Sequence, residues 1–277
     1  GFADELAILL DADVVVLGLA GHVSHSLIKS SPSSRSMNQA SLRLYTLEEQ
    51  VAHLQEIITP YVEQARDKQQ PVTVIGHSIG AWLANRVVQG LTAVSTPASK
   101  PPLTLFLMPF LEQNMKDPSY AIKHRLLIRM PWLIRVIVAI VPLLRVLPRS
   151  VRRWVLGSQI KGMAPEYVRL VEEGMLHRGA VHNYLYLART EMVSHQKRFD
   201  TQSLQSLVEA RRLSALYVSG GDEWAPPEME RRLATEARVP TTILDKSKVS
   251  HAFSLTASQA SLVAKWVKDE VDARKQI

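Results

Sequence analysis

Short runs of β-branched and other apolar residues alternate with helical patterns along this chain, and this alternation is the feature that constrains the fold most. Parallel strands buried on both faces read as continuous apolar runs, and each needs a crossover, usually a helix, to reach its neighbour. The alternation therefore predicts the α/β class, with a mostly parallel sheet and helices on both of its faces. The predicted strands are Asp13–Leu19, Pro71–Ile75, Leu103–Met108, Ser214–Ser219 and Thr241–Leu244.

The helices are predicted from the spacing of their apolar residues and from signals at their ends. Thr46 and Glu49 have the spacing of a capping box and start a helix whose apolar residues share one face. The span 110–212 has helical patterns and no convincing strand, so we expect it to be a helical lid or cap inserted on the sheet. The serine-rich segment Ser24–Ser41 is predicted to be a loop. Further helices are predicted at Ala81–Gly90, Pro165–Leu176, Val181–Phe199, Pro226–Arg238 and Ser254–Arg274.

The segment Gly76-His77-Ser78-Ile79-Gly80 lies between an apolar strand and a helical run. A strand, a sharp turn and a helix in this order hold a serine with its hydroxyl exposed above a sheet. We expect glycine at positions 76 and 80 because a Cβ atom on Gly76 or Gly80 would collide where strand and helix meet. Ser78 is the predicted nucleophile, the Ile79 amide at the helix N-terminus is the predicted oxyanion donor, and His77 is expected to pack beneath the turn. The alternative is a glycine-rich helix entry in which the serine is only an N-cap.

A serine nucleophile needs a base, and the base needs an acid that orients it. Asp222 follows the fourth predicted strand, which places it at the same edge of the sheet as Ser78. His251 lies between the last strand and the last helix, and the order Ser, Asp, His is that of the α/β-hydrolases. Asp222 is thus the predicted acid and His251 the predicted base. Glu223 and Asp245 are the rival acids, and a surface loop position is the alternative for the histidine.

The positive charge of the chain is concentrated in one segment. The net charge is +7, and nine of the 33 Lys and Arg residues lie between Asp117 and Glu166, where there is no acidic residue. Apolar residues separate these charges, which argues against nucleic-acid binding, because a nucleic-acid groove combines positive charge with stacking groups. The longest uncharged stretch, Val136–Leu144, is far shorter than the roughly 20 residues that span a bilayer.

We therefore expect the segment 119–160 to lie in a membrane surface without crossing it. Trp132 and Trp154 stand near the ends of the apolar stretch, and Arg135 and Arg145 can reach toward lipid headgroups. The alternative is a soluble lid whose apolar face covers the active site. The two are compatible, because a lid that opens onto lipid would serve both.

The residue types exclude several kinds of site. The chain contains no cysteine, which removes disulfides, thiolate zinc ligands and thiol catalysis. His22 and His25 have the spacing of helical metal ligands, but they lie in a loop without a partner cluster. We expect neither a metal nor a cofactor.

Taken together, these segments resemble the lipid droplet-associated hydrolase family, a branch of the α/β-hydrolases. The resemblance spans nearly the whole chain and rests on GHSIGAW around Ser78, LAGH at 19–22, LYTLEEQVAH at 44–53, GGDEWAPP at 220–227 and SHAF at 250–253. It implies an α/β-hydrolase fold with an esterase-like Ser78–Asp222–His251 triad. It also implies a protein of the lipid droplet or endoplasmic reticulum surface, on the cytosolic face.

The start of the chain departs from the family pattern. In the family an early strand and a loop give a second oxyanion amide, whereas this chain begins at Gly1-Phe2, within the helix after that loop. We therefore expect a single α/β-hydrolase domain, 1–277, without its N-terminal strand or strands. Loss of one oxyanion donor typically costs about 10²–10³ in rate.

Three functions fit these observations. The first is a serine esterase that cleaves a hydrophobic lipid ester, such as a sterol ester or an acylglycerol, at a lipid surface. The second is a lipid-droplet interaction protein that keeps the hydrolase fold, has weak or no activity and acts through 119–160. The third is a soluble esterase or thioesterase.

Overall fold

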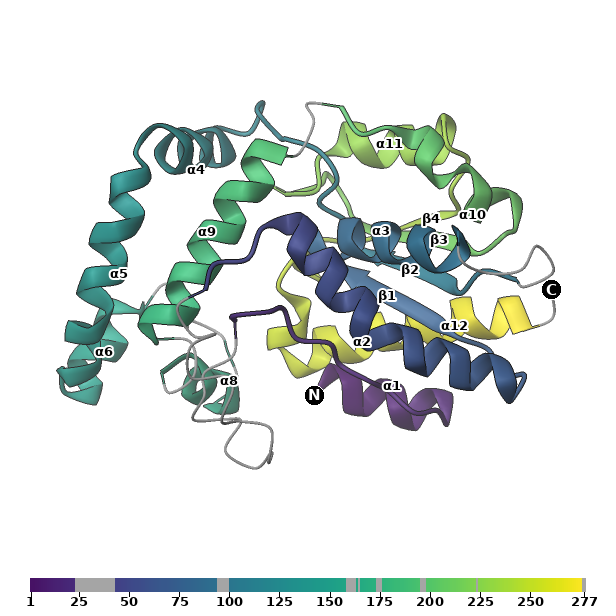
Figure 1. Ribbon diagram of the computed structural model, residues 1–277, viewed down its shortest axis with the longest axis horizontal. Coiled ribbons are helices and arrows are strands. Elements are labelled where there is room, and N and C mark those ends of the chain that lie inside the picture. The colour runs from purple at the N-terminus through teal and green to yellow at the C-terminus, as the bar shows by residue number, and fades with distance from the viewer. Residues whose placement is uncertain are drawn as a thin grey trace. The chain divides into compact units, whose positions relative to one another are not determined.

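Figure 1 shows the computed structural model of the chain, which describes residues 1–22, 43–93, 100–157, 163, 165–172, 176–194, 198–222 and 224–275. The chain forms two compact units. The sheet unit comprises Gly1–Leu17, Val51–Ala121 and His195–Ile277, and the helical unit comprises Gly18–Gln50 and Ile122–Ser194. The predicted insertion 110–212 thus contains the larger of the two segments that build the helical unit. The predicted loop Ser24–Ser41 lies outside the described residues.

The sheet is parallel throughout and its strands stand in chain order. Neighbouring strands pair along their length, and at the carboxyl end of the first strand His77 lies opposite Leu107 of the second. Four of the predicted strands are confirmed, the first of them two residues later than predicted. The strands are β1 (Thr73–His77), β2 (Leu103–Leu107), β3 (Leu213–Val218) and β4 (Thr241–Leu244).

The predicted strand at Asp13–Leu19 is wrong. Residues 13–19 form neither helix nor strand, and Val14, Val15 and Val16 are exposed. A strand needs a neighbour with which to exchange hydrogen bonds, and among the described residues β1 pairs only with β2. Composition gives a segment the propensity to form a strand but supplies no partner for it.

Helices cover both faces of the sheet, as the alternation predicts (Figure 1). Successive residues of β2 and β3 point to opposite faces, so Phe106 and Tyr217 join one buried cluster while Leu107 and Leu216 join the other. The first cluster includes residues of α3 (Ile79–Ala93), η5 (Thr201–Leu204), α10 (Gln205–Glu209) and α11 (Pro227–Thr235). The second includes residues of α1 (Phe2–Leu10), η6 (Phe253–Leu255) and α12 (Ala257–Lys275).

Most of the predicted helices form, with shifted ends. The capping box starts α2 (Leu47–Asp67): Glu49 N–H donates to Thr46 Oγ1 at 3.2 Å, and Thr46 N–H donates to Glu49 Oε2 at 2.9 Å. α3 is longer than predicted at both ends. The helix predicted at 254–274 begins only at residue 257, because residues 253–255 form the short turn η6.

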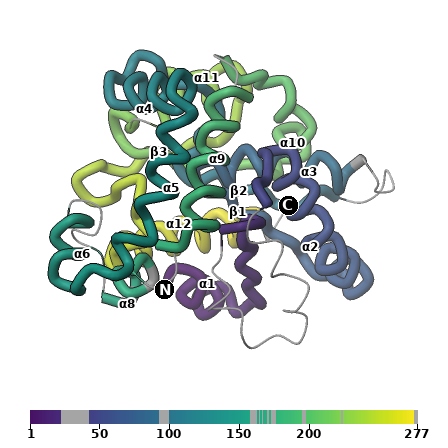
Figure 2. Tube along the Cα trace, turned by 60° about the vertical axis from the view of Figure 1, so that its left-hand side comes forward, coloured from purple at the N-terminus to yellow at the C-terminus, as the bar shows by residue number. Residues whose placement is uncertain are grey.

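The helical unit consists of helices and connecting segments, and the described part of the span 110–212 contains no strand. Figures 1 and 2 show α5 and α9 side by side. The α5 side chains at positions i, i+4 and i+7, namely Ile134, Val138 and Val141, are buried. The helices are α4 (Pro118–Arg129), which begins in the sheet unit, α5 (Pro131–Val146), α6 (Arg149–Val155), α8 (Pro165–Leu170) and α9 (Arg178–Ser194).

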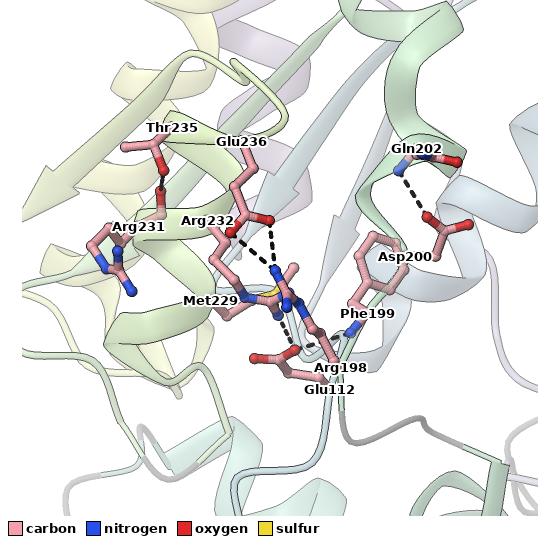
Figure 3. Close-up of polar contacts among 10 residues, drawn as sticks. All are labelled: Glu112, Arg198, Phe199, Asp200, Gln202, Met229, Arg231, Arg232, Thr235 and Glu236. Carbon is pink, nitrogen blue, oxygen red and sulfur yellow. Dashed lines mark hydrogen bonds and ion pairs between the residues drawn. The ribbon is translucent and has the colours of Figure 1, made fainter.

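Inside the sheet unit, one buried carboxylate joins the two chain segments that precede and follow residues 122–194 of the helical unit. Glu112, which follows β2, accepts a hydrogen bond from the amide of Phe199 at 3.0 Å and forms an ion pair with Arg232 of α11 (Figure 3). Arg232 and Glu112 are both buried. Beside them Arg198 pairs with Glu236 at the surface. The segment that leaves the sheet unit and the segment that returns to it are therefore joined at Glu112.

Candidate active site

The predicted nucleophile stands on a sharp turn between β1 and α3. Ser78 has a φ of 55°, in the left-handed region that side chains other than glycine rarely adopt. Its N–H donates to the carbonyl oxygen of Leu107 at 3.0 Å, and its own carbonyl accepts from the amides of Ala81 at 3.0 Å and Phe110 at 3.1 Å. Backbone strain of this kind costs about 1–3 kcal/mol and is concentrated at functional sites. The turn has the strand–turn–helix geometry of a nucleophile elbow.

The steric reason given for the two glycines holds for one of them. A Cβ atom on Gly76 would lie 2.3 Å from the carbonyl oxygen of Gly80 and 2.6 Å from the Cα of Ala81, so no side chain fits there. A Cβ atom on Gly80 would meet nothing within 4 Å, and the expected collision at this position is wrong. The helix approaches the strand with its backbone at positions 80 and 81, while the Cβ direction at 80 points into open space.

The predicted acid follows β3 in a turn that its own side chain stabilises. Gly220 and Gly221, with φ of 74° and 66°, turn the chain after the strand. One carboxylate oxygen of Asp222 then accepts the amides of Trp224 at 2.7 Å and Ala225 at 2.8 Å. The second carboxylate oxygen is left for another partner.

That partner is the predicted base. His251 Nδ1 lies 2.7 Å from Asp222 Oδ2, so its Nε2 is the ring nitrogen left to act on a serine. Burial alone would raise the pKa of Asp222, but the hydrogen bond and charge of His251 and the two backbone amides outweigh burial and lower this pKa. The carboxylate is therefore ionised, which is the form that orients an imidazole and stabilises its positive charge.

Asp245, one of the two rival acids, does not take this place. Asp245 follows β4, is exposed and accepts the amide of Ser247 at 2.8 Å. Glu223 lies outside the described residues. The acid paired with His251 is thus the residue that the strand-end position predicted.

The residue before Ser78 lies beside the predicted base. The ring of His77 lies 5.0 Å from the ring of His251, centroid to centroid. In the described part of the chain no hydrogen bond joins the Ser78 hydroxyl to His251. Such bonds are often long in unliganded enzymes and tighten when substrate binds. Ile79 is the first residue of α3, so its amide has no acceptor within the helix and is free to bind an oxyanion.

The acid turn is supported by three aromatic rings that the sequence did not mark as functional. Trp224 packs edge-on against Phe110 at 5.5 Å and against Tyr120 at 5.7 Å, and Asn114 donates to the backbone carbonyl of Asp222 at 3.3 Å. The only sequence signal was the position of Trp224 two residues after the acid. These contacts bind the Asp222 turn to the segment 110–120.

The residues predicted for membrane association lie in the helical unit. Trp132 and Trp154 are 54% and 82% exposed, and Arg135 and Arg145 are also exposed. Arg145 contacts His177 Nδ1 at 3.1 Å. No single helix among the described residues is long and apolar enough to span a membrane, whereas α4 and α5, bent by 91° at their junction, pass that test as a pair.

α5 is apolar on two opposite sides. Opposite the buried stripe, Val136, Ile140 and Leu143 repeat the i, i+4, i+7 spacing and are 42%, 46% and 62% exposed. Trp132 stands one turn before them on the same side. A helix with a buried apolar stripe and an exposed one presents the exposed stripe to a second apolar phase or to a partner.

α6 presents a cluster of positive charge around one buried carboxylate. Glu172 accepts hydrogen bonds from Arg149 at 3.1 Å and Arg153 at 3.0 Å, and Arg152 lies 3.9 Å away. Burial alone would raise the pKa of Glu172, but the hydrogen bonds from Arg153 and Arg149 outweigh burial and lower this pKa. Three guanidinium groups around one carboxylate leave a surplus of positive charge beside Trp154.

Residues 2–254 match the family described as lipid-droplet associated hydrolases. The chain belongs to this family. The match extends over both units and makes the chain a hydrolase by family. The parallel sheet with helices on both faces is the α/β-hydrolase fold that the sequence predicts for a member of it.

Two solved structures are similar to this member of the lipid-droplet associated hydrolases. The RedJ thioesterase from the prodiginine biosynthetic pathway in Streptomyces coelicolor is 15% identical, with a TM-score of 0.49, over 98% of this chain and 83% of that chain. The Vlm2 thioesterase domain, bound with a dodecadepsipeptide, is 15% identical, with a TM-score of 0.43, over 82% and 75%. None of the curated proteins matches the chain.

No metal site is formed by the described residues of this family member, since no group of three His, Asp or Glu side chains is placed to hold an ion. His22 instead lies against Tyr184 with its Nδ1 3.1 Å from the carbonyl oxygen of Ala20. His25 lies outside the described residues.

Proposed function

We propose that this family member is a serine hydrolase that cleaves hydrophobic carboxylic esters of lipids. The observation that carries the proposal is the left-handed Ser78 turn on the same edge of the sheet as the Asp222–His251 pair, which is joined at 2.7 Å. A strained serine turn alone would be compatible with a structural role. A half-buried, ionised acid that orients a histidine beside that turn has a direct use in acyl transfer.

The reaction follows from these positions. Ser78 Oγ attacks the ester carbonyl carbon while His251 Nε2 accepts the hydroxyl proton, and Asp222 stabilises the imidazolium. The carbonyl oxygen becomes an oxyanion that accepts the Ile79 amide at the N-terminus of α3. When the intermediate collapses, the bond to the alcohol oxygen breaks and the proton on His251 passes to that oxygen. Water then attacks the acyl-enzyme by the same route and releases the acid.

The lipid character of the substrate is proposed from the family and from the helical unit. The exposed stripe of α5, with Trp132, and the surplus charge of α6, with Trp154, suit a surface that is apolar inside and carries phosphate groups outside. We propose that these helices rest on the cytosolic face of a lipid droplet or of the endoplasmic reticulum. Sterol esters and acylglycerols are the substrate classes to compare first.

The serine mechanism is tested with purified protein and a fluorophosphonate probe, which forms a covalent bond to an activated serine. The wild type should be labelled and should release the alcohol from a short-chain aryl ester. Ser78→Ala should abolish both, while Ser206→Ala, at an exposed serine of α10, should leave both unchanged. Labelling that persists in Ser78→Ala would refute the proposal.

A second function is favoured by one observation, the exposed apolar stripe of α5. A protein that only attaches other components to a lipid surface would need this stripe and would not need the triad. Under that alternative Ser78→Ala leaves droplet binding and every cellular effect of the protein intact. Under the hydrolase proposal the same variant still binds droplets but fails to restore lipid ester turnover in cells that lack the protein.

A further inference from the structure

We infer that His77 is a positioning residue that ties the loop of His251 to the strand carrying Ser78. The inference rests on the proposed serine hydrolase activity and adds to it a residue outside the Ser–Asp–His set. His77 is the last residue of β1 and the immediate chain neighbour of Ser78. Any group that holds the base from this position holds it relative to the nucleophile.

The connection is one hydrogen bond. His77 Nε2 lies 2.8 Å from the backbone carbonyl oxygen of His251, 174 positions later in the chain. A carbonyl oxygen can only accept, so Nε2 carries the proton and donates it. The nucleophile and the backbone of the base are thus linked by a single side chain.

The His77 ring is held so that this donor keeps its direction. Its ring lies 5.0 Å from the His251 ring, and the Phe253 ring, also 5.0 Å away, is inclined to it by 75°. Phe253 is buried and is backed by Phe2 of α1 at 5.1 Å. Neighbours on two sides therefore restrict rotation of the His77 ring away from the carbonyl.

Side chains of Gln259 and Asp222 also hold the base loop, and neither replaces this hydrogen bond. On the far side, Gln259 Oε1 of α12 accepts the Ser250 amide at 3.1 Å and its hydroxyl at 2.8 Å. At the ring, Asp222 holds Nδ1 of His251. Without His77 the loop could turn about Ser250 while the Asp222 bond still formed, and the Nε2 atom of the base would then move relative to Ser78.

The kind of residue matters as well as its reach. Burial and the nearby His251 lower the pKa of His77 to about 4, so the ring is neutral at physiological pH. A neutral donor holds the carbonyl without adding a positive charge beside the imidazolium that forms on His251 during acyl transfer. A lysine or arginine could donate the same hydrogen bond, but it would oppose that charge.

The test compares two substitutions of similar length. His77→Gln keeps a donor, because its amide nitrogen is as many bonds from Cβ as the imidazole Nε2, whereas His77→Met fills the space without one. We expect His77→Met to slow fluorophosphonate labelling and to lower kcat for an aryl ester by about 30- to 100-fold, since small displacements of a catalytic group have effects of that size. KM should change by less than about threefold, and His77→Gln should recover labelling to within about fivefold of wild type.

Phe2→Leu is the control for packing, because it removes the next ring in the row and leaves the hydrogen bond. It should lower the unfolding temperature as much as His77→Met does while labelling stays within about threefold of wild type. Equal rates in His77→Met and wild type, with labelling that still depends on Ser78, would overturn the role of His77 and leave the hydrolase proposal standing. Equal losses in the Gln and Met variants would also overturn it. A wild type that is not labelled would instead remove the hydrolase proposal on which the inference rests.

Discussion

The contrast between the two glycines of the serine turn gives the sharpest test of the site. Gly76→Ala and Gly80→Ala each add one methyl group within the same five residues. In Gly76→Ala the added carbon would stand 2.3 Å from the carbonyl oxygen of Gly80, whereas in Gly80→Ala it would meet nothing within 4 Å. One variant must move the start of α3 away from β1, and the other need not move anything.

The size of both effects follows from these distances. An ordinary contact begins at 3.4 Å, so in Gly76→Ala strand and helix must separate by about 1 Å, and overpacking of this kind costs about 1–3 kcal/mol of folding free energy. A displacement of about 1 Å at a catalytic group can lower the rate by about 10²-fold. In Gly80→Ala the lost flexibility of a helical glycine should add about 0.5–1 kcal/mol of stability.

Urea unfolding and the rate of fluorophosphonate labelling measure the two effects on the same samples. Gly76→Ala should unfold at lower urea and label about 10²-fold more slowly, and Gly80→Ala should unfold at equal or higher urea and label within a few-fold of wild type. If Gly80→Ala loses as much labelling as Gly76→Ala, steric fit at the turn is not what the glycines provide. If Gly76→Ala behaves like wild type, the close approach of β1 and α3 is not needed to hold Ser78.

Three further outcomes are expected from other parts of the molecule. The free energy of unfolding should fall as the pH drops from about 6.5 to about 4. In this range unfolded His77 takes up a proton, whereas folded His77, with its pKa lowered to about 4, does not. Urea titrations should show a smaller fall in His77→Gln than in the wild type. Trp132→Ser and Trp154→Ser should each weaken flotation with lipid vesicles by about tenfold without changing the unfolding temperature, since both rings are largely exposed; unchanged flotation would remove α5 and α6 as the lipid surface. Glu112→Gln should lower the free energy of unfolding in urea by about 3–5 kcal/mol, because it leaves the Arg232 charge buried without its partner. A loss under about 1 kcal/mol would show that the pair does not hold the segments on either side of residues 122–194.

The sheet and the order of the site were predictable because their signals are local. Four strands read as apolar runs, and a parallel sheet brings their carboxyl ends to one edge, so Ser78 and Asp222 were expected at the same edge of the sheet. The capping box at Thr46 acts within one helical turn and was likewise readable. His251 was predicted to be the base from its place after the last strand.

What could not be predicted depends on neighbours distant in the chain. Val14–Val16 have the composition of a strand, yet a strand also needs an adjacent strand, which no pattern in that segment reveals. Gly80 matched a motif, but its steric freedom depends on the direction in which a Cβ atom would point. His77 was placed beneath the turn, whereas its role depends on a carbonyl 174 positions away.

The two-sided α5 helix has a consequence for how this protein can change without losing its fold. The inward stripe of Ile134, Val138 and Val141 takes part in packing, so substitutions there are detected by any measurement of stability. The outward stripe of Val136, Ile140 and Leu143 contributes little to the folded chain in water, so a library sorted on unfolding temperature will accept polar residues at those positions. Under the proposed lipid binding, only a selection carried out in the presence of lipid would retain the apolar ones. A thermostable variant obtained without lipid should therefore be checked for loss of surface binding before its activity is compared with that of the parent.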